Sequence, residues 1–236
     1  MRRTQLGANL VQLTKYPAVF PMNCFIVTEE DGLTLVDSTM SSVAEDVAAE
    51  AKRQGKELRR ILLTHAHGDH VGGVAGVRER FHAVEVWISE RDAPILAGNK
   101  AVLPGEEQKP VKGYFVNVDW KPDRLFKDGD RVGSLDVVAA PGHTPGHVAF
   151  FDTRDRGLVA GDAFQTRGGM AVSGVLRPLF PFPAMATWSR HAAAKSAAIL
   201  RGLNPSVLAV GHGNAIHDPG SALEAAVAEA QRRLPE

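Results

Sequence analysis

The stretch Leu62–Gly73, with the sequence LLTHAHGDHVGG, restricts the possible folds of this chain most strongly. An apolar run ends there in three histidines and one aspartate within six residues, with small residues between them. The 236-residue chain has nine histidines, so a third of them lie in this one segment. We therefore expect a buried strand over Leu58–Thr64, followed by a tight turn that holds several imidazole groups at one edge of a sheet.

Apolar runs of strand length alternate with helical segments along the chain, which indicates an α/β fold. The runs Cys24–Glu30 and Leu33–Asp37 flank Asp31-Gly32, a dipeptide typical of a tight hairpin. Ser42–Glu45 has the spacing of a capping box, and the helix that it begins can end at Gly55. Further strands are expected at Leu135–Ala140, Val148–Asp152, Gly157–Ala160 and, as the last strand, Val207–Val210, with a second hairpin turn at Asp128-Gly129 and helices at Ala184–Leu200 and Ser221–Arg233.

No long Gly/Ser-rich or single-charge segment divides the chain, so we expect one domain over residues 1–236. The two halves also show a similar order of elements. A strand ending at Asp37, a helix and a strand ending at His65 are echoed by a strand ending at Asp162, a helix and a strand ending at His212. Two halves that face each other would bring these strand ends to one edge, although this order of elements is also common by chance.

The composition excludes several classes of protein. Lysine plus arginine equal aspartate plus glutamate at 27 each, so no overall charge attracts nucleic acid or an anionic membrane. The single cysteine, Cys24, lies in an apolar run, which favours a buried, unreactive thiol and a cytoplasmic location. No apolar segment has the length of a signal peptide or a membrane span. We expect a small-molecule substrate, and the oligomeric state stays open.

The histidine-rich segment has the side chains of a transition-metal site. In extended or loop geometry His65 and His67 point the same way, whereas a helix starting at His70 turns Asp69 and His70 toward an adjacent position. One tetrahedral ion with an open position uses fewer than four protein ligands. The segment therefore predicts two neighbouring metal ions.

Three residues elsewhere are candidates to complete this site. His143 lies in the rigid turn PGHTPGH, Asp162 ends a strand, and His212 lies between two glycines. Taken singly, a loop histidine usually bonds locally or faces solvent, and an aspartate after a strand often caps a helix. Together with four clustered candidates, all three favour a metal site. His147 of the same turn is expected either to orient the ligand loop or to form a local hydrogen bond.

The segment THAHGDHVGG, followed by PGHTPGH, a Gly-Asp at a strand end and a Gly-His-Gly, resembles the signature of the metallo-β-lactamase-fold hydrolase superfamily, in its glyoxalase II-like or lactonase-like branch. The resemblance covers nearly the whole chain. It implies a four-layer αββα sandwich of two pseudo-symmetric halves. The ligands that it implies are His65, His67 and His143 for the first metal, Asp69, His70 and His212 for the second, and Asp162 as the bridge.

The reaction that this resemblance implies is metal-dependent hydrolysis. Two divalent ions, zinc first with manganese or iron as alternatives, would lower the pKa of a shared water to roughly 7. The metal-bound hydroxide would attack an ester, lactone, thioester or amide-like bond of a small molecule, with Asp69 as the catalytic residue that orients the nucleophile and moves a proton. The alternative is a persulfide dioxygenase with one iron held by His65, His143 and Asp162.

Several positions refine this expectation. Asp37 resembles the acid that supports the histidine loop in the family, although Thr39 stands where a glycine is usual. Gln165 stands where the lactonases of the family have a tyrosine, so a lactone substrate would lack that hydroxyl. The loops 97–121 and 164–183 are expected to set specificity. Arg177 in the second loop either meets an anionic group of the substrate or belongs to a segment that packs onto the following helix.

Overall fold

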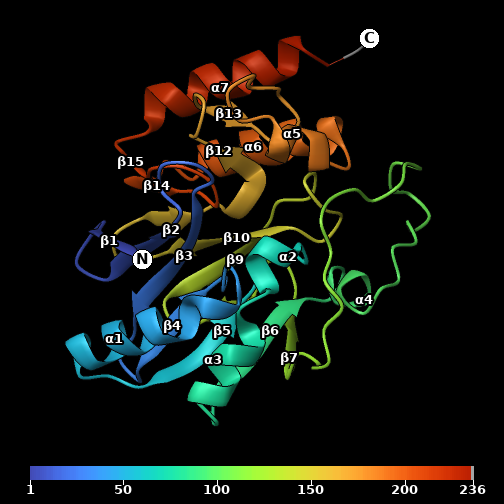
Figure 1. Cartoon of the computed structure of the whole chain (residues 1–236). Helices are drawn as coiled ribbons and strands as arrows, with labels where there is room; N and C mark the ends of the chain where they lie inside the picture. The colour runs from blue at the N-terminus through green and yellow to red at the C-terminus, as the bar shows by residue number, and fades with distance from the viewer. Residues whose placement is uncertain (235–236) are drawn as a thin grey trace.

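The computed structural model describes residues 1–234 and contains two large β-sheets between outer helices (Figure 1). The first sheet has the strand order β1-β2-β3-β4-β5-β6-β7. Its strands pair antiparallel from β1 to β4 and parallel from β4 to β7. Their bounds are β1 (Arg2–Gln5), β2 (Leu10–Lys15), β3 (Met22–Thr28), β4 (Leu33–Val36), β5 (Leu58–Leu62), β6 (Glu85–Ser89) and β7 (Arg124–Phe126).

The second sheet has the order β15-β14-β11-β10-β9-β8, and β12 and β13 form a separate small hairpin. Within this sheet β11 and β14 are parallel, and the other neighbouring strands are antiparallel. The bounds are β8 (Arg131–Val132), β9 (Leu135–Ala139), β10 (Val148–Asp152), β11 (Gly157–Val159), β12 (Phe164–Gln165), β13 (Ala171–Val172), β14 (Val207–Ala209) and β15 (Ile216–His217).

Helices cover the outer face of each sheet. In Figure 1, α1 and α3 lie at one end of the molecule and α6 and α7 at the other, with both sheets between them. Among the described residues, no helix is both long and apolar enough to span a bilayer. The helices are α1 (Ala44–Gln54), α2 (Gly68–Val71), α3 (Val74–Arg80), α4 (Ala93–Leu96), α5 (Phe182–Ala186), α6 (Arg190–Gly202) and α7 (Gly220–Arg232), with 3-10 turns at Ser41–Val43 and Gly161–Ala163.

Alternate residues of the central strands pack on opposite faces of their sheet, because successive side chains of a strand point to opposite sides. In β3, Cys24 and Ile26 pack with α1 and α3, whereas Phe25 and Val27 pack between the sheets. Phe150 of β10 enters the same core from the other sheet, and a third cluster joins that sheet to α6 and α7. The three apolar layers establish the four-layer αββα sandwich. Each large side chain buried there stabilises the fold by about 1.5–3 kcal/mol.

The similar order of elements in the two halves corresponds to a structural repeat. Strands β4 and β5 are parallel neighbours joined through α1, and β11 and β14 are parallel neighbours joined through α6. Asp37 and His65 follow the first pair, and Asp162 and His212 follow the second. Parallel strands end on the same edge of a sheet, so each half delivers one acid and one histidine to that edge.

The hairpin around Asp31-Gly32 is confirmed, because β3 pairs antiparallel with β4. The left-handed Gly55 ends α1 as predicted. The capping box was wrong, however. Ser42 lies inside the 3-10 turn that precedes α1, and its hydroxyl accepts a hydrogen bond from Lys15 instead of capping the helix. The thiol of Cys24 is buried as expected, and burial raises its pKa.

Three other predicted elements were wrong in part. The turn at Asp128-Gly129 does not join paired strands, because β7 belongs to the first sheet and β8 to the second. The helix expected at Ala184–Leu200 is broken between α5 and α6, where Ser189 caps the second helix through a bond from the Ala192 amide. A further strand, β15, follows β14 and pairs with it.

Candidate metal centre

The seven side chains predicted as ligands lie at the edge of the sandwich where β5, β11 and β14 end. They form three overlapping groups, and within each group the possible ligand atoms lie within 4.8 Å of one another. The structure therefore brings together residues from segments far apart in the chain. The groups are His65 with His67 and His143, His65 with His70 and Asp162, and Asp69 with His70 and His212.

The first group consists of three imidazole rings that face one point. His67 Nδ1 lies 3.1 Å from His65 Nε2 and 3.0 Å from His143 Nε2. Nitrogens that bind one zinc ion at 2.0–2.1 Å in tetrahedral geometry would be separated by roughly 3.3 Å. The spacing of these three nitrogens therefore suits a shared metal ion.

The group of Asp69, His70 and His212 adjoins the first group through Asp162. His212 Nε2 lies 3.3 Å from Asp69 Oδ2 and 3.2 Å from Asp162 Oδ2. The other oxygen of Asp162, Oδ1, lies 3.5 Å from His70 Nε2, and Oδ2 lies 3.4 Å from His143 Nε2. The Asp162 carboxylate is thus within reach of both groups.

Each of the five clustered histidines uses its other ring nitrogen for a partner within the protein. Carbonyl and carboxylate oxygens can only accept hydrogen bonds, so His67, His70 and His212 carry their proton on that outer nitrogen. Their inner nitrogens then offer a lone pair to a metal ion. The pairs are His65 Nδ1 with Thr64 Oγ1 (3.0 Å), His67 Nε2 with Lys112 O (2.8 Å), His70 Nδ1 with Asp37 Oδ2 (2.8 Å), His143 Nδ1 with Ser173 Oγ (2.9 Å) and His212 Nδ1 with Pro21 O (2.7 Å).

Two buried atoms at the centre of this cluster lack a hydrogen bond. Within residues 1–234, neither His70 Nε2 nor Asp162 Oδ1 has a hydrogen-bond partner. Buried polar atoms are rarely left without a partner, because their desolvation is costly. Imidazole nitrogens and carboxylate oxygens are also the donors that zinc and related divalent ions prefer. Both observations fit a site built for metal ions.

The protonation of the clustered histidines depends on their burial and on three neighbouring carboxylates. Burial lowers the pKa of His65 and His143 well below the usual value. Burial also acts against protonation of His70 and His212, but neighbouring carboxylates outweigh it. Asp37 and Asp162 raise the pKa of His70, and Asp162 with Asp69 raises that of His212 to about 10. A divalent ion would displace protons from these two rings.

Asp37 supports the histidine loop, as the sequence predicted. It is fully buried after β4, and its carboxylate accepts hydrogen bonds from the Thr64 amide (2.8 Å) and from Thr64 Oγ1 (2.8 Å), besides its contact with His70. Asp37 and Thr39 both adopt left-handed backbone conformations, with φ of 58° and 48°. Thr39 therefore takes the conformation for which a glycine is usual, despite its branched side chain.

Sequence reasoning missed Asp92, which joins two ligand loops. Its buried carboxylate accepts hydrogen bonds from the Ala66 amide (2.9 Å), Thr144 Oγ1 (2.7 Å) and the Gly146 amide (2.8 Å). Asp92 thus ties the loop of His65 and His67 to the loop of His143. Its signal in the sequence was an acid just after β6, the parallel neighbour of β5.

Asn23 was also missed, and it holds the His212 loop. Its side-chain amide donates to Val210 O and Gly213 O, both at 2.7 Å, and its backbone amide donates to Gly211 O at 2.9 Å. Asn23 is buried within β3. An asparagine inside the apolar run PMNCFIV was the signal that could have identified it.

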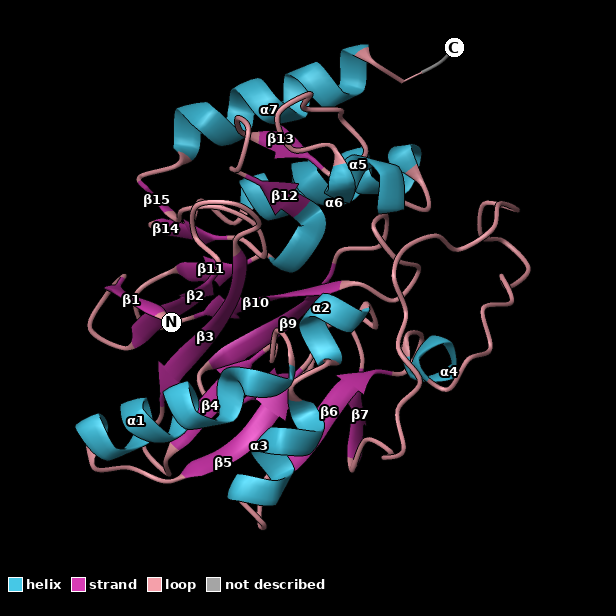
Figure 2. Ribbon diagram, viewed as in Figure 1, coloured by secondary structure: helices cyan, strands magenta, loops and turns pink. Residues whose placement is uncertain are grey.

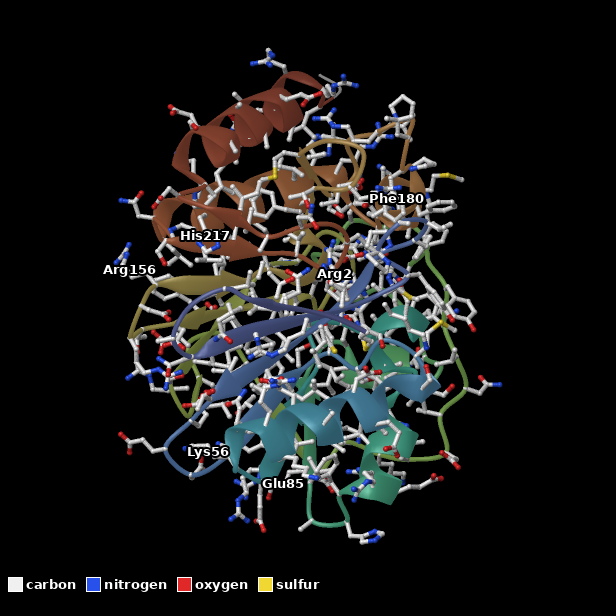
Figure 3. All side chains as sticks on the ribbon, turned by 60° about the vertical axis from the view of Figure 1, so that its left-hand side comes forward. Arg2, Lys56, Glu85, Arg156, Phe180 and His217 are labelled. Carbon is white, nitrogen blue, oxygen red and sulfur yellow. The ribbon has the colours of Figure 1, made fainter. Side chains whose placement is uncertain are left out.

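The remaining histidines have simpler surroundings. His147 is buried, burial lowers its pKa to about 3, and its Nε2 accepts a hydrogen bond from the Asp162 amide at 3.0 Å. It therefore orients a ligand loop, one of its two expected roles. His82, His191 and His217 are exposed. Figure 3 shows His217 on the opposite side of the view from Phe180, whose ring packs against His212.

A cavity of about 600 Å³ opens onto the cluster. Five of the seven candidate ligands line it, whereas His65 and His70 lie behind them. Arg177 does not line the cavity, because its guanidinium pairs with Glu229 of α7 and donates to Met170 O. The lining residues outside the cluster are Tyr16, Phe20, Met22, Met40, Gly113, Tyr114, Phe182, Pro183, Met185 and Ala186.

The long loop between α4 and β7, which is drawn beside α2 in Figure 2, contacts the cluster through its backbone carbonyls. His67 Nε2 donates to Lys112 O, and the Gly68 amide donates to Tyr114 O at 2.7 Å. Gly113 has a φ of 120°, and a Cβ atom there would overlap the ring of His67. The loop can therefore support His67 only with glycine at position 113.

The sequence of this chain is similar to those of several known proteins. Residues 18–212 match the model of the metallo-beta-lactamase superfamily. "Uncharacterized protein YobT" of Bacillus subtilis (strain 168) is 44% identical over 233 residues, 98% of this chain and 100% of that protein. "Probable metallo-hydrolase YflN" of the same organism is 32% identical over 205 residues, 79% of this chain and 77% of the relative. Hydroxyacylglutathione hydrolase GloC of Haemophilus influenzae is 29% identical over 150 residues, 61% and 66% of the two chains.

Two solved structures show a similar fold. A metallo-beta-lactamase from Pontibacter korlensis has a TM-score of 0.75 at 18% identity, over 98% of this chain and 99% of that one. TTHA1623, solved in a di-iron-bound form, has a TM-score of 0.63 at 25% identity, over 94% and 97% of the two chains. The first likeness concerns the fold alone.

Proposed function

This chain belongs to the metallo-β-lactamase superfamily of metal-dependent hydrolases, and from that premise we propose that its seven clustered side chains hold two divalent ions for the hydrolysis of a small molecule. The observation that carries the proposal is the position of Asp162. Its carboxylate lies within 3.5 Å of His70, His143 and His212, which belong to two different ligand groups. One carboxylate between two sets of imidazole rings supports a pair of neighbouring ions.

The residues divide into two sets around this carboxylate. His65, His67 and His143 would hold one ion, and Asp69, His70 and His212 would hold the other. Divalent ions in such a site lower the pKa of water to roughly 7 and polarise a carbonyl oxygen. Zinc suits these nitrogen and oxygen donors, and the di-iron form of TTHA1623 supports iron as a second choice.

Asp69 has a second task as the catalytic acid–base group. Asp69 is partly exposed, whereas the other six candidate ligands are buried, and Asp69 lines the cavity. Burial opposes its ionisation, but His212 and His70 lower its pKa below the ordinary value, so it stays a carboxylate at neutral pH. From this position Asp69 can orient the attacking water and carry a proton toward the leaving group of an ester, lactone, thioester or amide.

The single-iron alternative has less support. It uses His65, His143 and Asp162, but His67 Nδ1 lies within 3.1 Å of the inner nitrogens of both histidines. A metal held by those two rings would therefore meet His67 as well. Two of the relatives described above, the probable metallo-hydrolase YflN and the hydroxyacylglutathione hydrolase GloC, are named as hydrolases, which also favours hydrolysis.

The test uses His67→Ala and His212→Ala, one ligand from each set. Protein reconstituted separately with zinc, manganese and iron is assayed against a panel of esters, lactones and thioesters. Each variant is expected to lose at least about 100-fold in kcat/KM, since a lost ligand should cost more than the 10- to 100-fold typical of a lost supporting group. The exposed His191→Ala serves as the control and keeps full activity.

Unchanged turnover in both variants, with circular dichroism showing that both are folded, would contradict the proposal. Oxygen uptake on glutathione persulfide by the iron form, without hydrolysis of any panel member, would favour the dioxygenase instead.

A further inference from the structure

The wall of the cavity away from the metal cluster is almost entirely apolar. Its side chains come from four segments: the loop between β2 and β3 with the start of β3, the residue Met40 after β4, the long loop before β7, and α5. We call the apolar wall the side chains of Tyr16, Phe20, Met40, Tyr114, Phe182 and Met185. Within the described residues, the polar side-chain groups of the apolar wall are the hydroxyls of Tyr16 and Tyr114.

In the part of the chain that the structure describes, no lysine or arginine side chain faces this cavity. Lys15, the neighbour of Tyr16, donates to Ser42 Oγ, and Arg167 donates to the carbonyl of Ala18 in the same loop. Recognition of a carboxylate or phosphate usually needs a charged partner or aligned backbone amides, so the part of the cavity away from the metal cluster is poorly suited to an anionic group of the substrate.

The apolar wall is also unusually exposed at the mouth of the cavity. Tyr16 is 56% exposed, Tyr114 61%, Phe182 51% and Met185 66%. Exposed apolar side chains that gather around one opening mark a surface that is covered in a complex. The volume of about 600 Å³ is within the range of small-molecule sites and leaves room for a group several carbons long.

The wall leads directly to the candidate metal site. The ring of Phe20 lies 5.3 Å from that of His212 and 5.1 Å from that of Phe182, measured between centroids. Phe180, behind Phe20, lies 5.4 Å from His212. An apolar chain that follows these rings would therefore start beside the metal cluster and end at the mouth of the cavity.

We infer that the substrate is an uncharged ester or thioester whose extended apolar acyl group lies along the apolar wall. This inference rests on the proposed hydrolase function. Water adds across the acyl bond and yields a carboxylic acid and an alcohol or thiol, so the reaction needs no redox partner. Glutathione conjugates carry two carboxylates, and these would meet no lysine or arginine along the described lining of the cavity.

The first experiment varies the acyl chain. Zinc- or manganese-loaded protein is assayed with p-nitrophenyl acetate, butanoate and octanoate below their aggregation concentrations. Each methylene that becomes buried should raise kcat/KM by up to about fourfold. We expect the octanoate to exceed the acetate by at least about 100-fold. Equal kcat/KM values for the two esters would overturn the inference while leaving the proposed hydrolase intact.

The second experiment varies charge at a constant acyl chain. The octanoyl thioester of N-acetylcysteamine is neutral, and the octanoyl thioester of glutathione carries the charges of the peptide. We expect the neutral thioester to be hydrolysed at least about 10-fold faster in kcat/KM. Faster hydrolysis of the glutathione thioester would contradict the inference.

Wall variants locate the binding site without relying on catalysis. A neutral fluorophore, N-phenyl-1-naphthylamine, is titrated into metal-free protein. Met185→Glu should weaken its binding about 10-fold and reduce the octanoate-to-acetate ratio in the loaded enzyme. Leu179→Glu is the matched control, because Leu179 is 85% exposed and does not line the cavity. Equal effects of the two substitutions would overturn the assignment of the wall. Normal fluorophore binding without any hydrolysis would instead contradict the proposed function.

Discussion

At the scale of single residues, the second ring nitrogen of each histidine decides how the cluster can act. Three of these nitrogens donate to oxygens that cannot donate in return: Lys112 O, Asp37 Oδ2 and Pro21 O. Protonation on the outer side fixes both the tautomer and the orientation of the ring, as supporting groups do around metal ligands. The candidate site is therefore organised by its protein surroundings as well as by its ligands.

Asp92 provides a prediction about pH. Burial raises its pKa from 3.8 to about 6, although three donors face the carboxylate. Between pH 4 and pH 6 the folded protein thus keeps a proton that the unfolded chain loses, so the contribution of Asp92 to stability falls as pH rises through this window. The expected loss is about 3 kcal/mol. Urea unfolding of metal-free wild type and Asp92→Asn from pH 4 to pH 7 measures it.

The difference between the two proteins isolates Asp92, because the other titrating groups are common to both. Asp92→Asn should lack this part of the pH dependence, although it is less stable at low pH because it has fewer acceptor sites for three donors. Parallel pH profiles of the two proteins would show that the carboxylate is ionised throughout.

The candidate ligands could be predicted from the sequence, whereas two of the residues that position them left only an ambiguous signal there. His65, His67, Asp69 and His70 are adjacent in a recognisable segment, and His143 and His212 lie in glycine-containing turns that are also recognisable. Asp92 and Asn23 act mainly on backbone groups of distant loops, and backbone groups leave no mark in the sequence. Only the tertiary structure shows which loops they join.

At the scale of elements, hydrogen bonds between loops hold the loops around the candidate metal site in place. The gap between α5 and α6 is an example, since the amides of Trp188 and Ser189 donate to the carbonyls of His143 and Gly142. The alanine-rich composition of 184–200 favours a continuous helix. Two tertiary hydrogen bonds and the cap at Ser189 divide it, and local composition could not predict that division.

The loop before β7 leads to a second prediction. Gly113→Ala should force the loop away from His67 and lower kcat/KM of the metal-loaded protein at least about 10-fold, because a Cβ atom would overlap the imidazole ring. Gly105→Ala is the matched control, since Gly105 also has a positive φ, 89°, but has open space around its Cβ position. Steady-state hydrolysis of both variants, with thermal melting to compare stability, makes the comparison. A similar loss in both would point to backbone strain rather than to displacement of His67.

At the scale of the whole molecule, both halves contribute candidate ligands to one site. The layer order follows from apolar runs that bury both strand faces, and the repeat of a strand, a helix and a strand was visible in the sequence. The crossing from β7 in the first sheet to β8 in the second was not visible in the sequence. Asp128-Gly129 makes a turn whether or not the two flanking strands pair, and the sequence does not show which strands pair.

Metal removal should therefore lower the stability of the entire fold. Ions that bind only the folded chain stabilise it by about 4 kcal/mol when their concentration is 1,000 times Kd. For a chain of this size each kcal/mol corresponds to about 2–4 °C in Tm, so chelation should lower Tm by roughly 10 °C. Calorimetry with and without EDTA measures the shift, and the double variant His67→Ala, His212→Ala should respond much less. An unchanged Tm in the wild type would argue against ions that join the two halves.

The number of metal ions per chain tests the central proposal most directly. Native mass spectrometry of metal-free protein titrated with zinc should reveal two bound ions in the wild type and one in His212→Ala, because that substitution removes a ligand of a single ion. Saturation of the wild type at one ion, or an identical count of two in His212→Ala, would contradict the two-ion site.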